Sequence, residues 1–239
     1  MSVKKDEAIT EILADYESLA NLVLNQLDIL DGLITSSDLN ISDEQYNNIL
    51  ENEAKLDKWE VKLSDKIVNT IVLYQPVASE IRQLIALYRI TISLERIGDL
   101  AVSITRFMKG IKSEKVYASL ADFISNMMLL GTKMVKNALL SFMNKDIDLA
   151  IWTIKNEAVM DELNRKMLKK AIGKAQKIEE KKDILISFIQ IKEMVSNIER
   201  ISDHAANIAE ASIYAYEGKD IRHHRKREMK ENSKSADNE

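Results

Sequence analysis

Residues 94–101 read Leu-Glu-Arg-Ile-Gly-Asp-Leu-Ala, and residues 198–205 repeat them with few changes as Ile-Glu-Arg-Ile-Ser-Asp-His-Ala. The two copies are 104 residues apart (198 − 94). A second pair of segments, residues 53–57 (Glu-Ala-Lys-Leu-Asp) and residues 157–161 (Glu-Ala-Val-Met-Asp), has the same offset (157 − 53). Four Glu-x-x-x-Asp units, two in each half and all in one register, indicate an internal duplication.

Helix geometry explains why this register matters. Residues four apart in an α-helix lie on one face, about 6 Å apart along the axis, so each unit points two carboxylates the same way. The centres of the first two units, residues 55 and 97, have their midpoint at Pro76, the only proline in the chain. The midpoint in the second half is residue 180, inside the polar run 177–183. Helices that fold back at these points would place four carboxylates side by side in each half.

Clustered carboxylates repel one another, so they need either open water or a cation between them. A solvated acidic face is the simpler interpretation, because the chain has 38 acidic residues and the pairs Glu11/Asp15 and Glu179/Asp183 share the same spacing. Neither of those pairs repeats at the 104-residue offset, and the repeated register therefore favours a metal site in each half. The candidate metal ligands are Glu53, Asp57, Glu95, Asp99, Glu157, Asp161, Glu199 and Asp203.

Composition predicts an all-α protein. Among 239 residues, 46% are apolar and only six are glycine, which favours long helices and hardly any strand. Ser42 and Gln45 form a capping-box pattern, Pro76 suits the first turn of a helix, and Gly110 suits the end of one. With the apolar spacing, these signals predict six helices, over residues 7–34, 43–74, 76–110, 114–143, from about 146, and 182–217.

The duplication groups these helices into domains. Two tandem three-helix bundles, over residues 1–111 and 112–220, account for six amphipathic helices in two equivalent halves. Residues 221–239 form a charged tail that we expect to be disordered. Its run Arg-His-His-Arg-Lys-Arg at residues 222–227 is typical of a solvated terminus, although such runs also contact nucleic acid or membranes.

Several classes of protein are disfavoured. A net charge of −4 gives no general case for nucleic-acid binding, and the absence of cysteine excludes disulfides and thiolate metal sites. The N-terminal residues contain no signal-peptide pattern, and no apolar run is long enough to insert into a bilayer, so we expect a cytoplasmic protein. A carboxylate di-metal oxidase typically uses Glu-x-x-His pairs, and no such pair, cysteine nucleophile or Gly-rich phosphate loop occurs here. The sequence therefore predicts a protein that is not an enzyme.

Some residues near the repeated segments are not expected to be ligands. His204 directly follows Asp203 and points about 100° away from that carboxylate on a helix, which favours a surface or packing role. Arg96 and Arg200 are also offset from the carboxylate face, where they could pair with neighbouring acids or contact a partner. The methionines at 127, 128 and 134 are expected to fill the core.

The repeated segments resemble the PhoU family of bacterial phosphate regulators. The resemblance lies in the run Gln-Pro-Val-Ala-Ser-Glu-Ile-Arg at residues 75–82, which leads into residues 94–99, and in residues 198–210. It extends over residues 7 to 220, which is nearly the whole chain. The resemblance implies two similar three-helix bundles whose Glu-x-x-x-Asp motifs bind metal, and by motif it assigns that role to the same eight carboxylates.

The resemblance also implies a function. Members of the family are cytoplasmic negative regulators of phosphate uptake and phosphate-starvation signalling. They are thought to link a phosphate ABC transporter to a sensor histidine kinase, and many self-associate, so a homodimer is possible. The metal would be iron, zinc, magnesium or manganese. Related domains also occur with sodium–phosphate cotransporters, so a cotransporter is the alternative partner.

Overall fold

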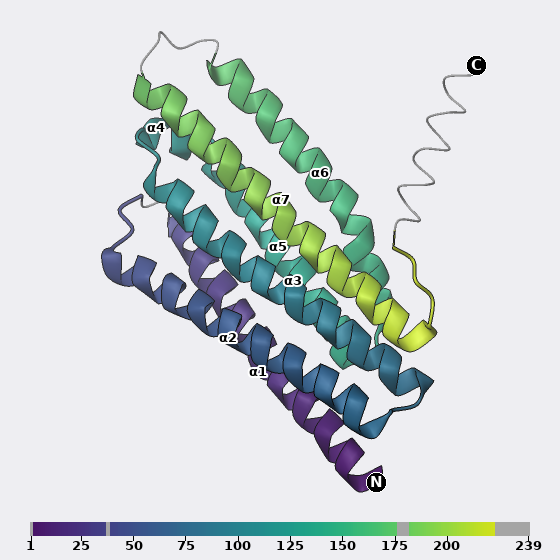
Figure 1. Ribbon diagram of the computed structural model, residues 1–239. Coiled ribbons are helices and arrows are strands. Elements are labelled where there is room, and N and C mark those ends of the chain that lie inside the picture. Colours follow the sequence, from purple (N-terminus) through teal and green to yellow (C-terminus); the bar gives the residue numbers. More distant parts are fainter. Residues whose placement is uncertain (1, 37–38, 176–181, 223–239) are drawn as a thin grey trace, which may run out of the picture.

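The computed structural model describes residues 2–36, 39–175 and 182–222, and these residues form helices without any strand. Figure 1 shows the helices as long, roughly parallel and antiparallel rods. Their bounds are α1 Ser2–Ser36, α2 Asp43–Tyr74, α3 Ala78–Lys109, α4 Glu114–Ala118, α5 Ala121–Met143, α6 Ile147–Ala175 and α7 Lys182–Glu217. The predicted all-α class is therefore confirmed.

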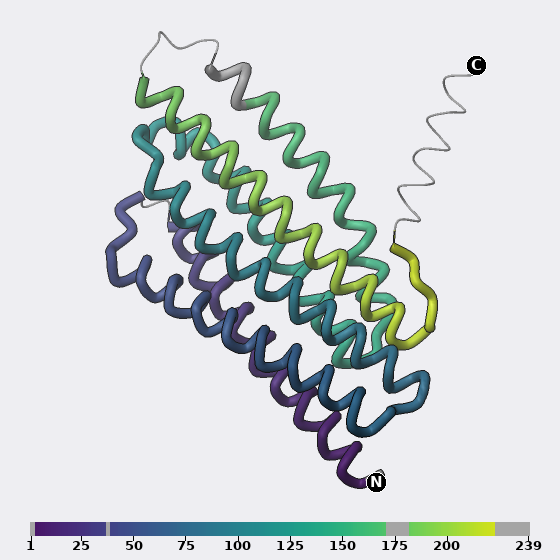
Figure 2. The backbone as a smooth tube through the Cα atoms, in the orientation of Figure 1, coloured from purple at the N-terminus to yellow at the C-terminus, as the bar shows by residue number. Residues whose placement is uncertain are grey.

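The helices form two bundles, as the duplication predicts. Helices α1, α2 and α3 pack against one another in the first half, and α5, α6 and α7 do so in the second. The most extensive contact between any two helices joins the halves, through α3 and α7, and α1 also packs against α5 (Figure 2). The two repeats therefore share one continuous apolar core, which includes the fully buried Met127, Met128 and Met134.

Helices α3 and α7 run antiparallel and are related by the duplication. A Cβ on Gly110 would lie 2.7 Å from Gln190 Cδ, and a Cβ on Gly218 would lie 3.5 Å from Arg82 Nε. In both pairs the two residue numbers add up to 300, as expected for two antiparallel helices in one register. Residues 98 and 202 also add up to 300, and they are equivalent positions of the two repeats because they are 104 apart (202 − 98). A local two-fold axis that relates the two halves therefore passes close to residues 98 and 202, beside the repeated motifs.

The turns agree with the predicted signals in part. The capping box at the start of α2 is confirmed, because the Gln45 backbone N–H donates to Ser42 Oγ at 3.1 Å and the Ser42 N–H donates to Gln45 Oε1 at 2.9 Å. Pro76 lies outside α3, which begins two residues later, so its predicted place in the first helical turn is wrong. The chain reverses at Gln75, whose φ of 44° is left-handed, and Gly110 caps the end of α3 as predicted.

The predicted helix over 114–143 is split into α4 and α5. Val116 and Tyr117 are buried, and the Tyr117 hydroxyl donates to the Ile34 carbonyl oxygen at 3.2 Å. The backbone N–H groups just before α4 donate to Ser187 Oγ, which fixes this short helix beside the start of α7. The chain then turns at Leu120, which is the N-cap of α5.

Other predictions fall outside the described residues. The expected reversal near residue 180 lies within residues 176–181, and residues 223–239 contain nearly all of the predicted tail. The domain boundaries at residues 111 and 220 stay a prediction. Within the described residues, none of the helices combines the length and the apolar character that crossing a membrane requires.

Candidate metal centre

The first half brings three of its four predicted ligands together. Carboxylate oxygens of Glu53 and Asp57 on α2 and of Asp99 on α3 all lie within 4.8 Å of one another. Oxygens on opposite sides of a divalent cation are about 4 to 5 Å apart, because metal–oxygen bonds measure ~2.0 to 2.6 Å. Among the described residues, this is the one set of acidic or histidine side chains with such spacing. We call these three residues the first-half triad.

The triad concentrates negative charge. Burial raises the pKa of Glu53, and the neighbouring charges of Asp57 and Asp99 raise it further. Asp57 is exposed, whereas Glu53 and Asp99 are half-buried, so the cluster opens to solvent on one side. Its donors are carboxylate oxygens alone, which suit hard divalent cations. The residues present therefore fit a metal ion.

Glu95 lies beside the triad. Burial raises the pKa of its carboxyl, as do the charges of Asp99 and Asp57, while Arg96 lowers it. Arg96 Nε lies 3.3 Å from Glu95 Oε2, and its NH1 donates to Asp99 Oδ2 at 3.4 Å. The possibility that Arg96 pairs with neighbouring acids is confirmed. In the second half, Arg200 NH1 instead donates to Asn197 Oδ1 at 3.4 Å.

The four predicted ligands of the second half also lie close together. Burial raises the pKa of Asp203 to about 6, and the charges of Glu157, Glu199 and Asp161 contribute in that order. Burial and the charge of Asp161 likewise raise the pKa of Glu199. These four carboxylates do not converge into a second triad with the spacing of the first. The predicted grouping is thus present in both halves, but it is tighter in the first.

Asn164 is a neighbour of the second cluster that the sequence reasoning missed. Its Nδ2 donates to Glu199 Oε2, and this contact lowers the pKa of that carboxyl against the effect of burial. The equivalent residue in the first half is Glu60 (164 − 104), whose charge raises the pKa of Glu95. A comparison of the two repeats at the position three residues after Asp57 and Asp161 would have identified this difference.

Close helix packing positions the first-half ligands. Leu56 precedes Asp57 and is fully buried, and Gly98 precedes Asp99. A Cβ on Gly98 would lie 2.5 Å from Leu56 Cδ1, so a larger side chain could not fit without displacing that leucine. The glycine therefore lets α2 and α3 approach where the carboxylates meet.

His204 lies in a cationic environment between the halves. Burial lowers the pKa of its imidazole to about 4, and the charges of Arg200 and Arg96 lower it further. Its Nδ1 atom is buried and makes no hydrogen bond within the described residues. His204 is not part of the first-half triad. This placement agrees with the predicted surface or packing role.

Comparison with known proteins identifies the family. Residues 16–108 and 124–212 each match the profile of the PhoU domain, so both halves carry one copy. The chain belongs to the PhoU family. The family consists of regulatory accessory proteins and not of enzymes, which confirms the prediction that this PhoU-family protein is not an enzyme.

Similar PhoU proteins cover most of the chain. The phosphate-specific transport system accessory protein PhoU homolog 1 of Thermotoga maritima is 25% identical over 218 residues, which is 91% of this chain and 90% of that protein. The PhoU homolog of Pseudomonas aeruginosa is 29% identical over 187 residues, which is 77% of this chain and 74% of that protein.

Solved PhoU structures have the same fold. The crystal structure of PhoU from Streptococcus pneumoniae superposes with a TM-score of 0.78 at 21% identity, covering 90% of this chain and 98% of that one. PhoU from Pseudomonas aeruginosa gives a TM-score of 0.74, also at 21% identity, over 90% of this chain and 99% of that one. The tandem arrangement of two PhoU domains is therefore that of the family.

Proposed function

We propose that this protein is a metal-binding negative regulator of phosphate uptake and of phosphate-starvation signalling. The observation that supports it most strongly is the double match to the PhoU domain, together with relatives that are named as accessory proteins of phosphate-specific transport systems. In this proposal the protein acts in the cytoplasm, by contact with a phosphate transporter and a sensor kinase. No catalytic residue is required, since the effect is transmitted through binding.

The metal would act by neutralising each carboxylate cluster. Glu53, Asp57 and Asp99 would hold an ion directly, and Glu95 would complete the site on α3. Because these residues belong to two helices, a bound ion would fix the α2–α3 hairpin in one arrangement. Glu157, Asp161, Glu199 and Asp203 would do the same for α6 and α7 once their side chains converge on the ion. Magnesium and manganese suit an all-oxygen set best, and iron and zinc are the other candidates.

A deletion strain tests the regulatory role. Secreted phosphatase activity in phosphate-rich medium is expected to become constitutively high when the gene is removed and to return to normal when the full chain is restored. If sodium-coupled phosphate uptake changed while phosphatase activity did not, a sodium–phosphate cotransporter would be the partner instead. Unchanged phosphatase activity and unchanged phosphate uptake would show that the proposal is wrong.

A further inference from the structure

The carboxylate face of the second half continues beyond the metal ligands. On α7, residues 185, 189, 192, 196, 199 and 203 follow one another at intervals of three or four, so they share one face of the helix. On α6, residues 161, 165, 168 and 169 share a face in the same way. Six exposed residues beyond the ligands form what we call the α6–α7 surface: Arg165, Leu168, Lys169, Leu185, Ile189 and Lys192.

The two helices present this surface side by side. Helices α6 and α7 pack against each other, and Asn164 Nδ2 donates to Glu199 Oε2 across the contact. Burial raises the pKa of Glu199, and the charges of Arg165 on α6 and Lys192 on α7 oppose that rise. One cation from each helix therefore lies near this carboxylate, at the border between the metal cluster and the α6–α7 surface. Figure 1 shows the start of α7 beside the end of α6.

Three apolar side chains of the surface are open to solvent. Leu185 is 62% exposed, Ile189 is 52% exposed and Leu168 is 42% exposed. An amphipathic helix in a folded protein normally turns its apolar residues toward the core. Exposed apolar side chains that gather in one place commonly mark interaction sites.

Positive charge accompanies these apolar side chains. Beyond the ligands Asp161 and Glu199, the described side chains of residues 162–170 and 182–198 include six basic and three acidic groups. Two of the three acids each lie 2.7 Å from a lysine, Glu162 from Lys166 and Glu193 from Lys192. The α6–α7 surface is therefore both apolar and cationic, in a chain whose net charge is −4.

The duplication shows which part of this character is specific to the second half. In the 104-residue register, the counterparts of Leu185 and Ile189 are Ile81 and Ile85, so the apolar positions are common to both halves. The three cations have different counterparts. In place of Arg165, Lys169 and Lys192, the first half has Val61, Asp65 and Tyr88.

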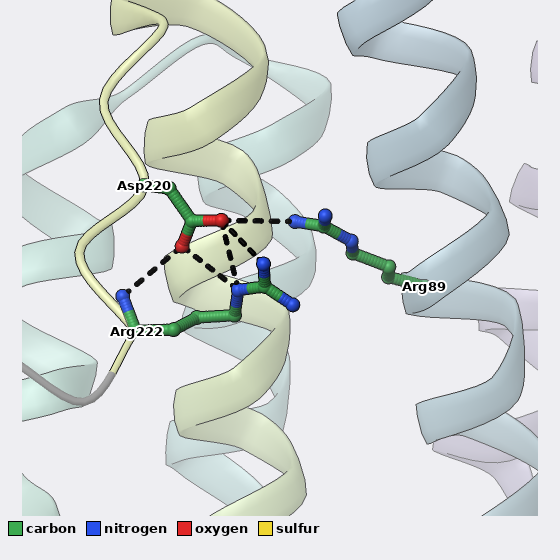
Figure 3. A network of polar contacts seen from close by, with 3 residues as sticks. All are labelled: Arg89, Asp220 and Arg222. Atoms are coloured by element: carbon green, nitrogen blue, oxygen red, sulfur yellow. Dashed lines mark hydrogen bonds and ion pairs between the residues drawn. The ribbon is translucent and has the colours of Figure 1, made fainter.

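A nearby cation of the first half has an acidic partner within the chain. Arg89, which follows Tyr88 on α3, has its NH1 atom 3.9 Å from Asp220 Oδ2 (Figure 3). Asp220 also accepts a hydrogen bond from Arg222 Nε at 2.8 Å. The chain that follows α7 thus supplies an acid to the first half. For the cations of the α6–α7 surface, we expect the acids to come from another molecule.

We propose that the α6–α7 surface binds an amphipathic helix of a partner protein, one that carries acidic residues beside its apolar stripe. The apolar stripe would pack on Leu168, Leu185 and Ile189. The acidic residues would pair with Arg165, Lys169 and Lys192. The proposal deepens the regulatory function and rests on it for the role of the partner, whereas the binding itself is defined by the surface.

The shape and the charge of the surface favour a single helix over other occupants. Residues 185–192 extend about 10 Å along α7, which suits one helix lying across or along the strip. A flat anionic membrane that covered this face would also meet the carboxylates of the neighbouring metal cluster. Two copies of this chain joined through the same surface would bring their cations together.

Peptide binding by the purified full chain tests the proposal. The probe is a fluorescein-labelled peptide of about 18 residues, with leucine at every third or fourth position and glutamate on both sides of the leucine stripe. Fluorescence anisotropy is measured in a chelator, so that metal occupancy is the same in all variants. A peptide with lysine in place of each glutamate is expected to bind about tenfold more weakly, and so is a scrambled peptide of unchanged composition.

Charge variants identify the cations. Arg165→Gln with Lys169→Gln and Lys192→Gln should weaken binding of the glutamate peptide about tenfold, and substitution of the same three residues by glutamate should make the lysine peptide the stronger ligand. The matched controls replace Lys4, Lys136 and Lys155, which are exposed and lie outside the surface, by the same residues. These controls should keep the preference for the glutamate peptide. Circular dichroism measures whether each variant remains folded.

Apolar variants test the other part of the surface. Leu185→Gln with Ile189→Gln should weaken binding of the glutamate peptide about tenfold without changing the net charge. Leu73→Gln with Leu129→Gln is the matched control, because these leucines are 66% and 62% exposed and lie outside the surface.

Four outcomes would overturn the proposal. The first is equal binding of the glutamate and lysine peptides, or binding of neither, and the second is an equal loss in a variant and its matched control. The third is binding to phosphatidylglycerol vesicles without binding to the glutamate peptide, which would assign the surface to lipid. The fourth is a wild-type dimer that ignores the peptide and becomes monomeric in the Leu185→Gln, Ile189→Gln variant. Phosphatase regulation in the deletion strain is a separate readout, so failure of either proposal can be told from failure of the other.

Discussion

Single residues at equivalent positions make the two carboxylate clusters different. Glu60 adds a fifth negative charge near the first cluster, whereas Asn164, its equivalent, donates a hydrogen bond to Glu199 in the second. Arg96 pairs with two acids of the first cluster, whereas Arg200 donates to an asparagine. The first cluster therefore has more negative charge, whereas Arg165, Lys192 and Arg200 act on the carboxylates of the second. Asp203, the more buried aspartate, has the larger consequence for stability.

Asp203→Asn should stabilise the metal-free protein at neutral pH. The folded-state pKa of Asp203, about 6, is above the usual value of 3.8. Its protonated form therefore favours folding, and this contribution is complete below pH ~4 and lost as the pH rises through 6. At pH 7 the ionised side chain is a penalty, and removing it should raise the free energy of unfolding by about 1 to 2 kcal/mol after allowance for solvent screening. The gain should vanish near pH 4.

Urea unfolding in a chelator at pH 7 and at pH 4 measures this difference. The control is Glu51→Gln, which removes an exposed carboxylate of α2 outside both clusters. A gain of the same size at both pH values would contradict the assigned cause, since burial and the neighbouring charges penalise only the ionised form of Asp203.

At the scale of helices, the first-half triad requires a pair of helices, α2 and α3. Neither α2 nor α3 alone assembles the first-half triad, because two of its ligands come from one helix and the third from the other. The hairpin depends on the left-handed Gln75 and on the close approach of Gly98 to Leu56, which together set the axial register of the two helices. Metal binding is therefore expected to depend on both helices and to stabilise their pairing.

Glu53→Gln with Asp99→Asn should weaken the first metal site. The two substitutions keep the size of the side chains but remove two of three anionic ligands, so the affinity of that site for Mn²⁺ should fall at least tenfold. Isothermal titration calorimetry with Mn²⁺ or Mg²⁺, on protein from which a chelator has removed the metal, measures this affinity. Mass spectrometry measures the metal content of the same proteins. Glu11→Gln with Asp15→Asn is the control, because this pair has the same spacing but contacts Lys66. Unchanged metal content in the first variant would show that the triad is only a solvated acidic face.

At the scale of the whole molecule, the two repeats are expected to fold as one unit. Helix α3 makes its most extensive contacts with α7 of the other half, so separating the halves would expose the core face of both helices. The boundary between the two PhoU domains in the sequence therefore does not separate two units that fold independently. The chain contains two tryptophans, Trp59 in the first half and Trp152 in the second, which report on each half separately.

Single-tryptophan variants test this cooperativity. Trp59→Phe leaves a probe in the second half, and Trp152→Phe leaves one in the first. The fluorescence transition of each variant in urea is expected to coincide with its own loss of helical circular dichroism, as two-state unfolding requires. A fluorescence transition that is displaced from the circular dichroism transition in either variant would show that the halves unfold independently.

The sequence alone determined the helical class, the duplication and the residues of both carboxylate clusters. Spacing of four residues fixes which side chains share a helical face, and a fixed offset between repeats carries that face from one half to the other. The capping box of Ser42 and Gln45 was equally local, so it was predictable. The reversal at Gln75 was placed within one residue by the position of Pro76, although that proline lies outside the helix.

Only the tertiary structure decided how tightly each cluster converges and where the fourth predicted helix breaks. The break at Leu120 follows from contacts of Tyr117 with Ile34 and of the preceding backbone with Ser187, residues far apart in the sequence. The first-half triad converges where Gly98 packs against Leu56, and the equivalent of Gly98 in the second half is Ser202. Periodicity describes one helix at a time, whereas these features depend on the distance and register between helices, which side-chain packing sets.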